Sequence, residues 1–274
     1  MTAITAEDII QQIEKNGYCK IPQVYSPEQV QKALTLAIEW KERAEQSLSD
    51  NVPFLNRNQP MVYNLQNKDF YFLELLFEPP FLQQALIHFL NDMWFKQIPP
   101  DEPNYILRSY LARSSSGALP MHIDSFVPYT GDYCFVMQAS IILEDQNEAN
   151  GCTVVVPGSH NRGRYTTQES FDEAIPIESQ AGDLVLWDSR LWHGTKANAT
   201  GGTRWALIAT FGRWWIKQAF EIHRALPQEI YDKLTDGQKA VLGFCSIPYD
   251  DETKGIDMKR GFDSLMADVA GYQA

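Results

Sequence analysis

The chain has few cysteines, and none of them form a closely spaced pair. Only four occur among the 274 residues, at the widely separated positions Cys19, Cys134, Cys152 and Cys245. Structural zinc sites usually contain a Cys-x-x-Cys pair, and disulfide frameworks need a dense set of cysteines in a short chain. We therefore expect neither kind of site, and we expect four reduced thiols.

Basic residues and long apolar runs are also scarce. The chain has 23 Lys and Arg against 35 Asp and Glu, which gives a net charge of −12. Nucleic acids and anionic membranes bind basic faces, so we expect neither as a partner. No stretch approaches the roughly 18 apolar residues of a membrane span, and the N-terminus lacks a basic segment followed by an apolar run. We expect a cytoplasmic protein that binds a small molecule, and the sequence assigns no oligomeric state.

The residues that are present suffice for a large core. Hydrophobic residues make up 44% of the chain and aromatic residues 12%. This length is compatible with one domain. In the first hundred residues, Thr5 followed by Asp8, and Ser26-Pro-Glu-Gln29, are helix-start signals. Apolar spacing predicts helices over 5–17, 27–40, 70–77 and 80–93, a strand over 18–22, and a polar, Asn-rich loop over 47–68 that borders a pocket.

The pattern changes to short β-branched and aromatic runs near residue 104. Strands are expected near 104–112, 119–124, 134–144, 152–156, 175–178, 183–187, 190–195 and 204–214. Eight strands in two sheets predict a mainly-β jelly roll, that is, a cupin-like double-stranded β-helix, with flanking helices. A helix over 227–234 and a polar tail that wraps around the strands follow. The predicted single domain, 1–274, thus has helices over 1–100, a jelly-roll core over about 104–216 and a C-terminal part over 217–274.

The motif Pro120-Met-His-Ile-Asp124 contains the most informative residues. On a strand, alternate side chains share a face, so His122 and Asp124 are expected to project together. His193 lies further along the chain and provides a third ligand. Two histidines and one carboxylate on one side of a metal are typical of non-haem Fe(II) oxygenases. A His-x-Asp pair alone is a weak signal, but Arg204 follows His193 and suits the distal carboxylate of a diacid co-substrate.

Laid out in order, these motifs resemble the phytanoyl-CoA dioxygenase family of Fe(II)- and 2-oxoglutarate-dependent oxygenases. The likeness covers roughly 100–215, and the N-terminal helices agree with it. The matching elements are His122-Ile-Asp124, Asn150-Gly-Cys-Thr-Val-Val-Val-Pro157-Gly-Ser-His160, Gly182-Asp183, Trp192-His193-Gly-Thr195, Asn198 and Arg204. The resemblance implies a double-stranded β-helix and the use of Fe(II), 2-oxoglutarate and O₂.

The resemblance also implies roles for individual residues. His122, Asp124 and His193 would bind iron, and Arg204 would pair with the C5 carboxylate of 2-oxoglutarate. Thr195 faces the same side as His193 and would donate its hydroxyl to that carboxylate. We assign a co-substrate or substrate contact to one further residue, Gln138, for which an outward-facing strand position is an equal alternative.

The reaction implied is oxidative decarboxylation of 2-oxoglutarate to succinate and CO₂, coupled to attack on an unactivated C–H bond. Halogenating relatives have a small residue where this chain has Asp124, so hydroxylation, desaturation or ring formation is favoured over halogenation. The acidic composition lacks a basic cluster for coenzyme A, so a free small metabolite is the expected substrate. Residues considered for contact with it are Arg108, Arg113, Arg190 and Arg213, and, at the pocket mouth, Tyr63, Asn64, Tyr110, Phe126 and Tyr129.

Three histidines outside the motif are interpreted as structural residues: His88, His160 and His223. Trp187 and Trp192 are expected in the core or the pocket wall. Two alternatives of other classes stay open. One is a non-catalytic jelly-roll protein that binds a small molecule and retains a metal site, and the other is a cupin-like isomerase that uses another divalent metal.

Overall fold

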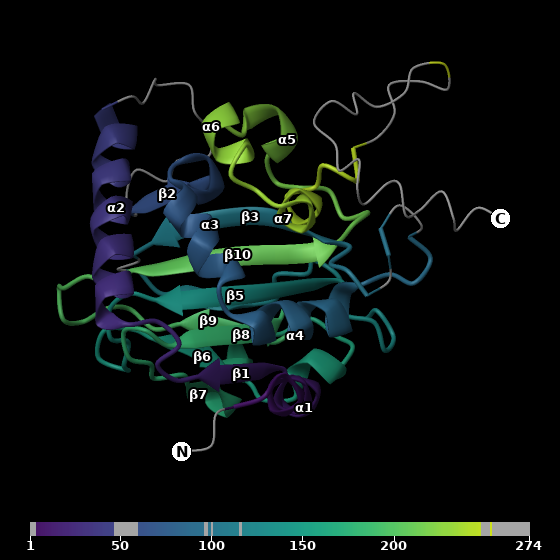
Figure 1. Ribbon diagram of the computed structural model, residues 1–274. Helices are drawn as coiled ribbons and strands as arrows, with labels where there is room; N and C mark the ends of the chain where they lie inside the picture. Colours follow the sequence, from purple (N-terminus) through teal and green to yellow (C-terminus); the bar gives the residue numbers. More distant parts are fainter. Residues whose placement is uncertain are drawn as a thin grey trace.

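Two antiparallel sheets lie face to face in the computed structural model, which describes residues 4–46, 60–95, 98–99, 101–114, 117–247 and 253. The larger sheet has six strands in the order β1-β8-β5-β10-β3-β2, and the smaller has four in the order β4-β9-β6-β7. Helices cover the outer face of the larger sheet (Figure 1). In the part of the chain that is described, the two sheets do not close into a barrel.

The N-terminal elements begin and end at the predicted signals. Helix α1 (Ala6–Asn16) has a capping box between Thr5 and Asp8, and Gly17 ends the helix at a φ of 84°. Strand β1 (Tyr18–Ile21) follows and pairs with β8. Helix α2 (Pro27–Gln46) begins after Ser26, whose N–H donates to Gln29 Oε1 at 2.9 Å. The two predicted helix starts and the first strand are therefore confirmed.

The segment after α2 differs from the expected loop. Residues 47–59 lie outside the described part of the chain, but β2 (Met61–Tyr63) is a strand and η1 (Leu65–Asn67) is a 3-10 helix. Strand β2 pairs with the end of β3, where Met61 opposes Arg113. The loop prediction is wrong here because a run of only three residues carries no periodic signal, and its pairing partner lies far along the sequence.

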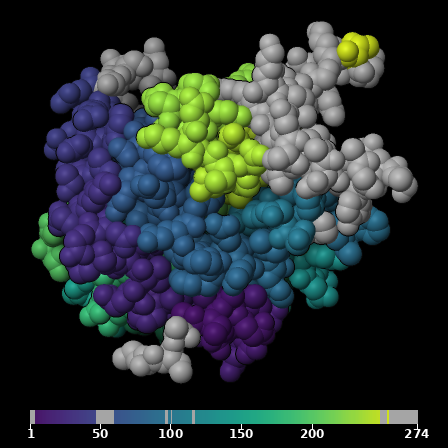
Figure 2. Space-filling view, viewed as in Figure 1, coloured from purple at the N-terminus to yellow at the C-terminus, as the bar shows by residue number. Residues whose placement is uncertain are grey.

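Two apolar helices complete the cover over the larger sheet. Helix α3 spans Phe70–Phe77, as predicted. Helix α4 spans Pro80–Leu90 and is slightly shorter than predicted. Their fully buried side chains, such as Phe72 and Leu86, belong to one core cluster with strand residues such as Leu107 and Leu207. Figure 2 shows the helical segments covering this face of the molecule, so the strands behind them are hardly visible. The inner face of the larger sheet can therefore carry polar groups.

All eight predicted strands of the core are present. They are β3 (Tyr105–Arg113), β4 (Leu119–His122), β5 (Val136–Ile142), β6 (Thr153–Val155), β7 (Ile175–Pro176), β8 (Leu184–Asp188), β9 (His193–Thr195) and β10 (Ala206–Arg213). Two 3-10 helices, η2 (Ser159–Asn161) and η3 (Gln168–Glu173), lie between β6 and β7.

The helix predicted over 227–234 is present but shorter, as α6 (Gln228–Tyr231). Two further short helices, α5 (Ile222–Ala225) and α7 (Asp236–Val241), flank it. Pro227 and Thr235 each begin a new turn, and the Thr235 side chain caps α7. The predicted polar tail lies mostly outside the described residues, and the single-domain assignment stays a prediction. No helix in the described ranges is long and apolar enough to cross a membrane.

The end of α1 provides a test of the packing between the helical layer and the sheets. A Cβ at Gly17 would come within 2.7 Å of both His160 Nδ1 and Leu191 Cδ1, whereas a Cβ at Gly201 would meet nothing within 4 Å. Both glycines have positive φ. We predict that Gly201→Ala lowers the free energy of unfolding by about 1–2 kcal/mol through backbone strain. We expect Gly17→Ala to lower the free energy of unfolding by about 1–3 kcal/mol more than Gly201→Ala does, through overpacking. Urea unfolding measures both, and equal losses would contradict the packing described here.

Candidate metal centre

Pairing between β4 and β9 brings the two motif histidines together. His122 lies directly opposite His193 in this ladder, and their ring centroids are 4.2 Å apart. On its other side β9 pairs with β6, where Val155 opposes His193. Two ladders therefore hold β9, and the register of short strands fixes where both imidazoles point.

Asp124 reaches the histidines by a different route from the one expected. Strand β4 ends at His122, so alternation along one strand does not place the carboxylate. Instead, the N–H groups of Asp124 and Ser125 both donate to the carbonyl oxygen of Ser189, at 2.8 and 3.1 Å. Ser189 lies in the connection between β8 and β9. The chain thus turns back at Asp124, and the turn is anchored on the segment that leads to His193.

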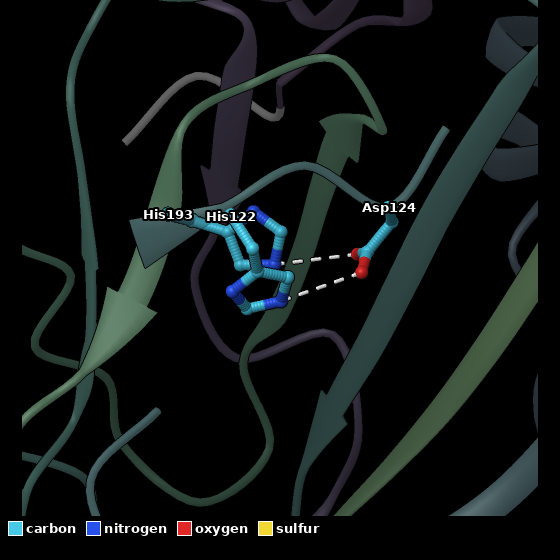
Figure 3. Close-up of side chains that lie close together, drawn as sticks. All are labelled: His122, Asp124 and His193. Carbon is cyan, nitrogen blue, oxygen red and sulfur yellow. Dashed lines mark ion pairs between the residues drawn. The ribbon is translucent and has the colours of Figure 1, made fainter. Parts of the chain in front are cut away.

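The three side chains converge on one point (Figure 3). Asp124 Oδ1 lies 3.5 Å from His122 Nε2, and Asp124 Oδ2 lies 3.3 Å from His193 Nε2. One ligand atom from each residue falls within 4.8 Å of the others, which is close enough to share one metal ion. The structure therefore brings together the three residues that the sequence singled out as metal ligands.

The outer nitrogens of both imidazoles are held by backbone carbonyls. His122 Nδ1 lies 2.8 Å from Pro120 O, and His193 Nδ1 lies 2.9 Å from Leu191 O. A carbonyl oxygen only accepts hydrogen bonds, so each Nδ1 carries the proton and donates. In the neutral rings each Nε2 then presents a lone pair to the carboxylate. This is the tautomer in which metal-binding histidines are usually held.

The electrostatics of the cluster call for a cation. Burial by itself raises the pKa of Asp124, but the charge and hydrogen bonds of His193 and His122 outweigh it and hold that pKa well below its usual range. Burial likewise favours neutral His193, but the Asp124 carboxylate raises the His193 pKa overall. With neutral rings, two nitrogen lone pairs would face carboxylate oxygens without a proton between them. A divalent ion resolves this repulsion, and imidazole with carboxylate is a donor set that suits Fe(II).

Gln138 faces inward from β5 and orients the carboxylate. Its Nε2 donates to Asp124 Oδ2 at 3.1 Å, and its Oε1 accepts from the Thr210 hydroxyl at 2.7 Å. The alternative of an outward-facing Gln138 is therefore wrong. Its side chain hydrogen-bonds to the Asp124 carboxylate and to the Thr210 hydroxyl, and its predicted contact with the co-substrate or substrate stays a prediction.

A cavity of about 250 Å³ opens beside the three ligands, between the two sheets. Arg204, which lies just before β10, is 7% exposed and lines it, and the Arg204 N–H donates to Ser114 Oγ at 3.0 Å. Thr195 also lines the cavity, and its Oγ1 accepts from Leu119 N–H at 3.0 Å. The remaining lining residues are Met61, Leu111, Arg113, Leu119, His122, Asp124, Gln138, Ser140, Gln146, Thr153, Trp187, His193, Ala206, Ile208 and Thr210.

The strand register orders the cavity from the metal ligands to Arg204. Thr210 of β10 lies opposite Gln138 at the end nearest Asp124, and Ala206 lies opposite Arg113 further along. The four residue steps from Thr210 to Ala206 span about 13 Å along a strand. Arg204 precedes Ala206, so it stands at the far end. Arg204 is thereby separated along the cavity from His122, Asp124 and His193.

The other histidines named in the sequence lie outside this centre. His160 Nε2 donates to Glu14 O at 3.2 Å, and His88 lies 3.1 Å from the Glu14 carboxylate. Burial lowers the pKa of His160, which favours its neutral form. Both are structural, as predicted, and His223 lies in α5.

Three of the four arginines considered for the substrate have structural contacts instead. Arg190 forms a buried salt bridge with Asp188 at 2.7 Å, and Arg213 donates to the carbonyl oxygens of Cys134 and Asn91. Arg108 Nε donates to Lys217 O at 3.1 Å. Of the four, Arg113 alone is among the residues that line the cavity.

The residues proposed for the pocket mouth do not line the cavity. Tyr110 is buried, and its hydroxyl donates to Phe72 O, so it belongs to the core under α3. Phe126 and Tyr129 are exposed to 76% and 71%. The cavity residues that the sequence did not reveal are chiefly Ser140, Gln146, Thr153 and Thr210. One sequence signal could have identified some of these residues. Polar side chains stand at alternate positions of an otherwise apolar strand, as Gln138 and Ser140 do.

Comparison with known proteins agrees with this geometry. The chain is 25% identical over 257 residues to "Dioxygenase af480" of Aspergillus fumigatus. This alignment covers 90% of this chain and 79% of that protein. It is 32% identical over 111 residues to "Phytanoyl-CoA dioxygenase 1" of Oryza sativa, which covers 34% of this chain and 40% of that protein. A match to an uncharacterized protein of Mycobacterium tuberculosis, 25% identical, covers 60% of this chain and 56% of that protein.

Solved structures share the fold. The carbocyclase SnoK from nogalamycin biosynthesis superposes with a TM-score of 0.59 at 18% identity, covering 78% of this chain and 87% of that one. HygX from Streptomyces hygroscopicus, solved with nickel and 2-oxoglutarate, superposes with a TM-score of 0.57 at 18% identity. This match covers 79% of this chain and 90% of that one. The predicted jelly roll is thereby confirmed.

The model of the phytanoyl-CoA dioxygenase (PhyH) family matches residues 13–206, a span that contains the three converging ligands and Arg204. Members of this family use Fe(II), 2-oxoglutarate and O₂. Because that match covers most of the chain, this protein belongs to the phytanoyl-CoA dioxygenase family of Fe(II)- and 2-oxoglutarate-dependent dioxygenases.

Proposed function

We propose that this dioxygenase hydroxylates an unactivated C–H bond of a small metabolite, with release of succinate and CO₂. The observation that carries the proposal is the convergence of His122 Nε2, His193 Nε2 and the Asp124 carboxylate at one end of a cavity that has Arg204 at its other end. Three ligands on one side leave the remaining coordination positions directed into the cavity. The cavity is large enough for a small ligand beside the ion.

His122, Asp124 and His193 are the proposed iron ligands. The carbonyls of Pro120 and Leu191 fix the two imidazoles with Nε2 toward the metal, and Gln138 holds Asp124 Oδ2. When bound, Fe(II) and 2-oxoglutarate would together activate O₂, which is the oxidant for attack on the C–H bond. The side chains contribute the geometry, because outer contacts of this kind orient metal ligands and tune their affinity.

Arg204 and Thr195 are the proposed site for the C5 carboxylate of 2-oxoglutarate. Burial lowers the pKa of Arg204, and the nearby Arg113 lowers it further, so an anion bound in the cavity would stabilise the charged guanidinium. A planar guanidinium suits a carboxylate, which it can bind through two parallel hydrogen bonds. Thr195 lines the same cavity, and its hydroxyl, whose oxygen accepts from Leu119 N–H, would donate to the same carboxylate.

Hydroxylation is favoured among the reactions that metal sites of this kind catalyse. Asp124 supplies the third ligand, whereas halogenating relatives have a small residue at that position. The solved structures that share the fold include the carbocyclase SnoK and the epimerase SnoN, so ring formation and epimerisation are the competing outcomes within this class. A non-catalytic binding protein or a cupin-like isomerase would have no need of a buried arginine opposite the metal ligands.

The most informative experiment is a metabolite screen that detects succinate. Purified protein with Fe(II), 2-oxoglutarate and air is incubated with fractionated metabolite pools, and the product of an active fraction is analysed by mass spectrometry. A gain of one oxygen atom that requires both O₂ and 2-oxoglutarate supports hydroxylation. Turnover that needs neither would assign the protein to another class of metalloenzyme.

Two substitutions separate the metal ligands from the co-substrate site. We predict that His193→Ala weakens divalent-metal binding by more than about 100-fold, beyond the usual effect of losing an outer contact. Arg204→Ala should retain the metal and raise the 2-oxoglutarate concentration for half-saturation by about 10–150-fold, because it removes a charge-assisted interaction of about 1.5–3 kcal/mol. Metal binding by calorimetry and 2-oxoglutarate titration measure the two effects.

The controls for these variants are His88→Ala and Arg224→Ala, since both residues are exposed and lie outside the cavity. Neither is expected to change either affinity. Unchanged 2-oxoglutarate affinity in Arg204→Ala would remove the assignment of that residue.

Gly194 tests whether the pairing of β4 with β9 sets the metal site. A Cβ there would come within 2.8 Å of Leu119 O and 3.2 Å of Met121 Sδ. Because Leu119 O is backbone, β4 must shift, and His122 shifts with it. We predict that Gly194→Ala lowers metal affinity by about 10–100-fold although it removes no ligand. Gly237→Ala, where a Cβ meets nothing within 4 Å, is the matched control and should leave metal affinity unchanged. Equal affinities in the two variants would refute this role.

A further inference from the structure

Each oxygen of the Asp124 carboxylate lies beside a different imidazole nitrogen. Oδ1 is 3.5 Å from His122 Nε2, and Oδ2 is 3.3 Å from His193 Nε2. The positions of the two imidazoles therefore give a metal ion no preference between the two oxygens. A carboxylate can bind an ion through one oxygen or through both, and the choice sets how many positions around the ion stay open.

One hydrogen bond distinguishes the two oxygens. Gln138 Nε2 donates to Asp124 Oδ2 at 3.1 Å, and no hydrogen bond from an amide reaches Oδ1 within the described part of the chain. A hydrogen bond occupies one lone pair of the accepting oxygen and draws negative charge from it. Oδ1 is therefore the stronger of the two oxygens as a metal ligand.

The direction of this hydrogen bond is fixed from outside the metal centre. An ionised carboxylate only accepts hydrogen bonds, so the amide nitrogen of Gln138 faces Asp124. The amide oxygen then faces Thr210, whose hydroxyl donates to Gln138 Oε1 at 2.7 Å. Thr210, Gln138 and Asp124 thus form one chain of hydrogen bonds in which each donor points toward the metal ligand.

Strand pairing holds Gln138 in this position. Gln138 lies on β5, directly opposite Thr210 of β10 on one side and Trp187 of β8 on the other. Residues directly opposite one another in a sheet share a face, and all three line the cavity. The Trp187 ring also lies 5.8 Å from the His193 ring. Gln138 is only 6% exposed, so its amide stands between two neighbours that limit its rotation.

The number of open positions around the ion matters for the proposed reaction. An octahedral ion bound by two imidazoles and one carboxylate oxygen keeps three positions, which suffice for two atoms of 2-oxoglutarate and for O₂. If both oxygens of Asp124 bind the ion, 2-oxoglutarate fills the two positions that remain. No position is then left for O₂.

We propose that the hydrogen bonds from Thr210 to Gln138 and from Gln138 to Asp124 keep the ion bound through Oδ1 alone, which preserves the position for O₂. This inference rests on the proposed dioxygenase function. It assigns a positioning role to Gln138 and Thr210, which act on the ion through Asp124. Access of O₂ to the ion is thereby controlled separately from the binding of the metal and of 2-oxoglutarate.

Nitric oxide tests the proposal without turnover, because it binds Fe(II) at an open position in place of O₂. Protein loaded anaerobically with Fe(II) and saturating 2-oxoglutarate is titrated with nitric oxide, and the adduct is measured by electron paramagnetic resonance. Gln138→Met removes the donor and keeps the length of the side chain. It should weaken nitric oxide binding by at least about 10-fold, the size expected for the loss of one hydrogen bond to a charged group. The affinities for Fe(II) and 2-oxoglutarate should change by less than about 3-fold, the low end of the range for a neutral hydrogen bond.

Threonine variants test the outer hydrogen bond. Thr210→Val keeps the shape of the side chain and removes the hydroxyl, so it should weaken nitric oxide binding by about 2–10-fold, because a neutral hydrogen bond contributes less than one to a charged group. Thr210→Ser restores the donor and should bind nitric oxide as the unsubstituted protein does. Thr153→Val is the matched control, because Thr153 lines the same cavity from β6 of the smaller sheet, outside this chain of hydrogen bonds. It should leave nitric oxide binding unchanged.

The contrary results are distinct from a failure of the proposed function. Unchanged nitric oxide affinity in Gln138→Met, with Fe(II) and 2-oxoglutarate bound, would overturn the inference and leave the dioxygenase proposal intact. A parallel loss of affinity for Fe(II), 2-oxoglutarate and nitric oxide would show that Gln138 only supports the structure of the site, and would overturn it too. Equal nitric oxide binding by Thr210→Val and Thr210→Ser would remove the role of the Thr210 hydroxyl. Failure of the unsubstituted protein to bind Fe(II) or 2-oxoglutarate would remove both proposals.

Discussion

The close approach of three electron-pair donors is the constraint on which the rest of this site depends. Two imidazole nitrogens and one carboxylate oxygen lie within 4.8 Å of one another, and both imidazoles are turned by backbone carbonyls so that Nε2 faces the carboxylate. With both imidazoles neutral, this arrangement is repulsive unless a cation lies between the three donors. The fold holds it through the pairing of His122 with His193 and through the two hydrogen bonds that tie Asp124 and Ser125 to Ser189.

The helical layer makes a polar interior possible on the other side of the larger sheet. Every residue of β5 is buried, yet Gln138 and Ser140 are polar. Their apolar neighbours on the outer face pack beneath α3 and α4 in the main core, so the inner face does not have to supply that burial. The same division explains how Arg204 lines a cavity within an otherwise apolar sandwich. Polar groups at these positions need partners, because burying them without one would be costly, and Gln138 finds them in Asp124 and Thr210.

Local signals in the sequence predicted the elements that depend on neighbouring residues. The capping boxes at Thr5 and Ser26 set the starts of α1 and α2, and all eight core strands lie where their composition indicated. The errors arise where contacts between residues far apart in the sequence determine the local structure. Strand β2 exists because β3 offers an edge, Asp124 leaves β4 because Ser189 holds it, and Tyr110 faces Phe72 rather than the pocket. Cavity residues such as Arg113 depend on sheet register, which the sequence alone does not fix.

The central claim is that one open-sided Fe(II) centre in this cavity binds 2-oxoglutarate through two of its vacant positions. Anaerobic visible absorption tests it most directly, because a 2-oxo acid chelated to Fe(II) gives a weak metal-to-ligand charge-transfer band that neither component shows alone. We expect the band to appear when 2-oxoglutarate is added to the Fe(II)-loaded protein, and to saturate at one equivalent of each. A colourless mixture, with iron bound and 2-oxoglutarate in excess, would contradict the account.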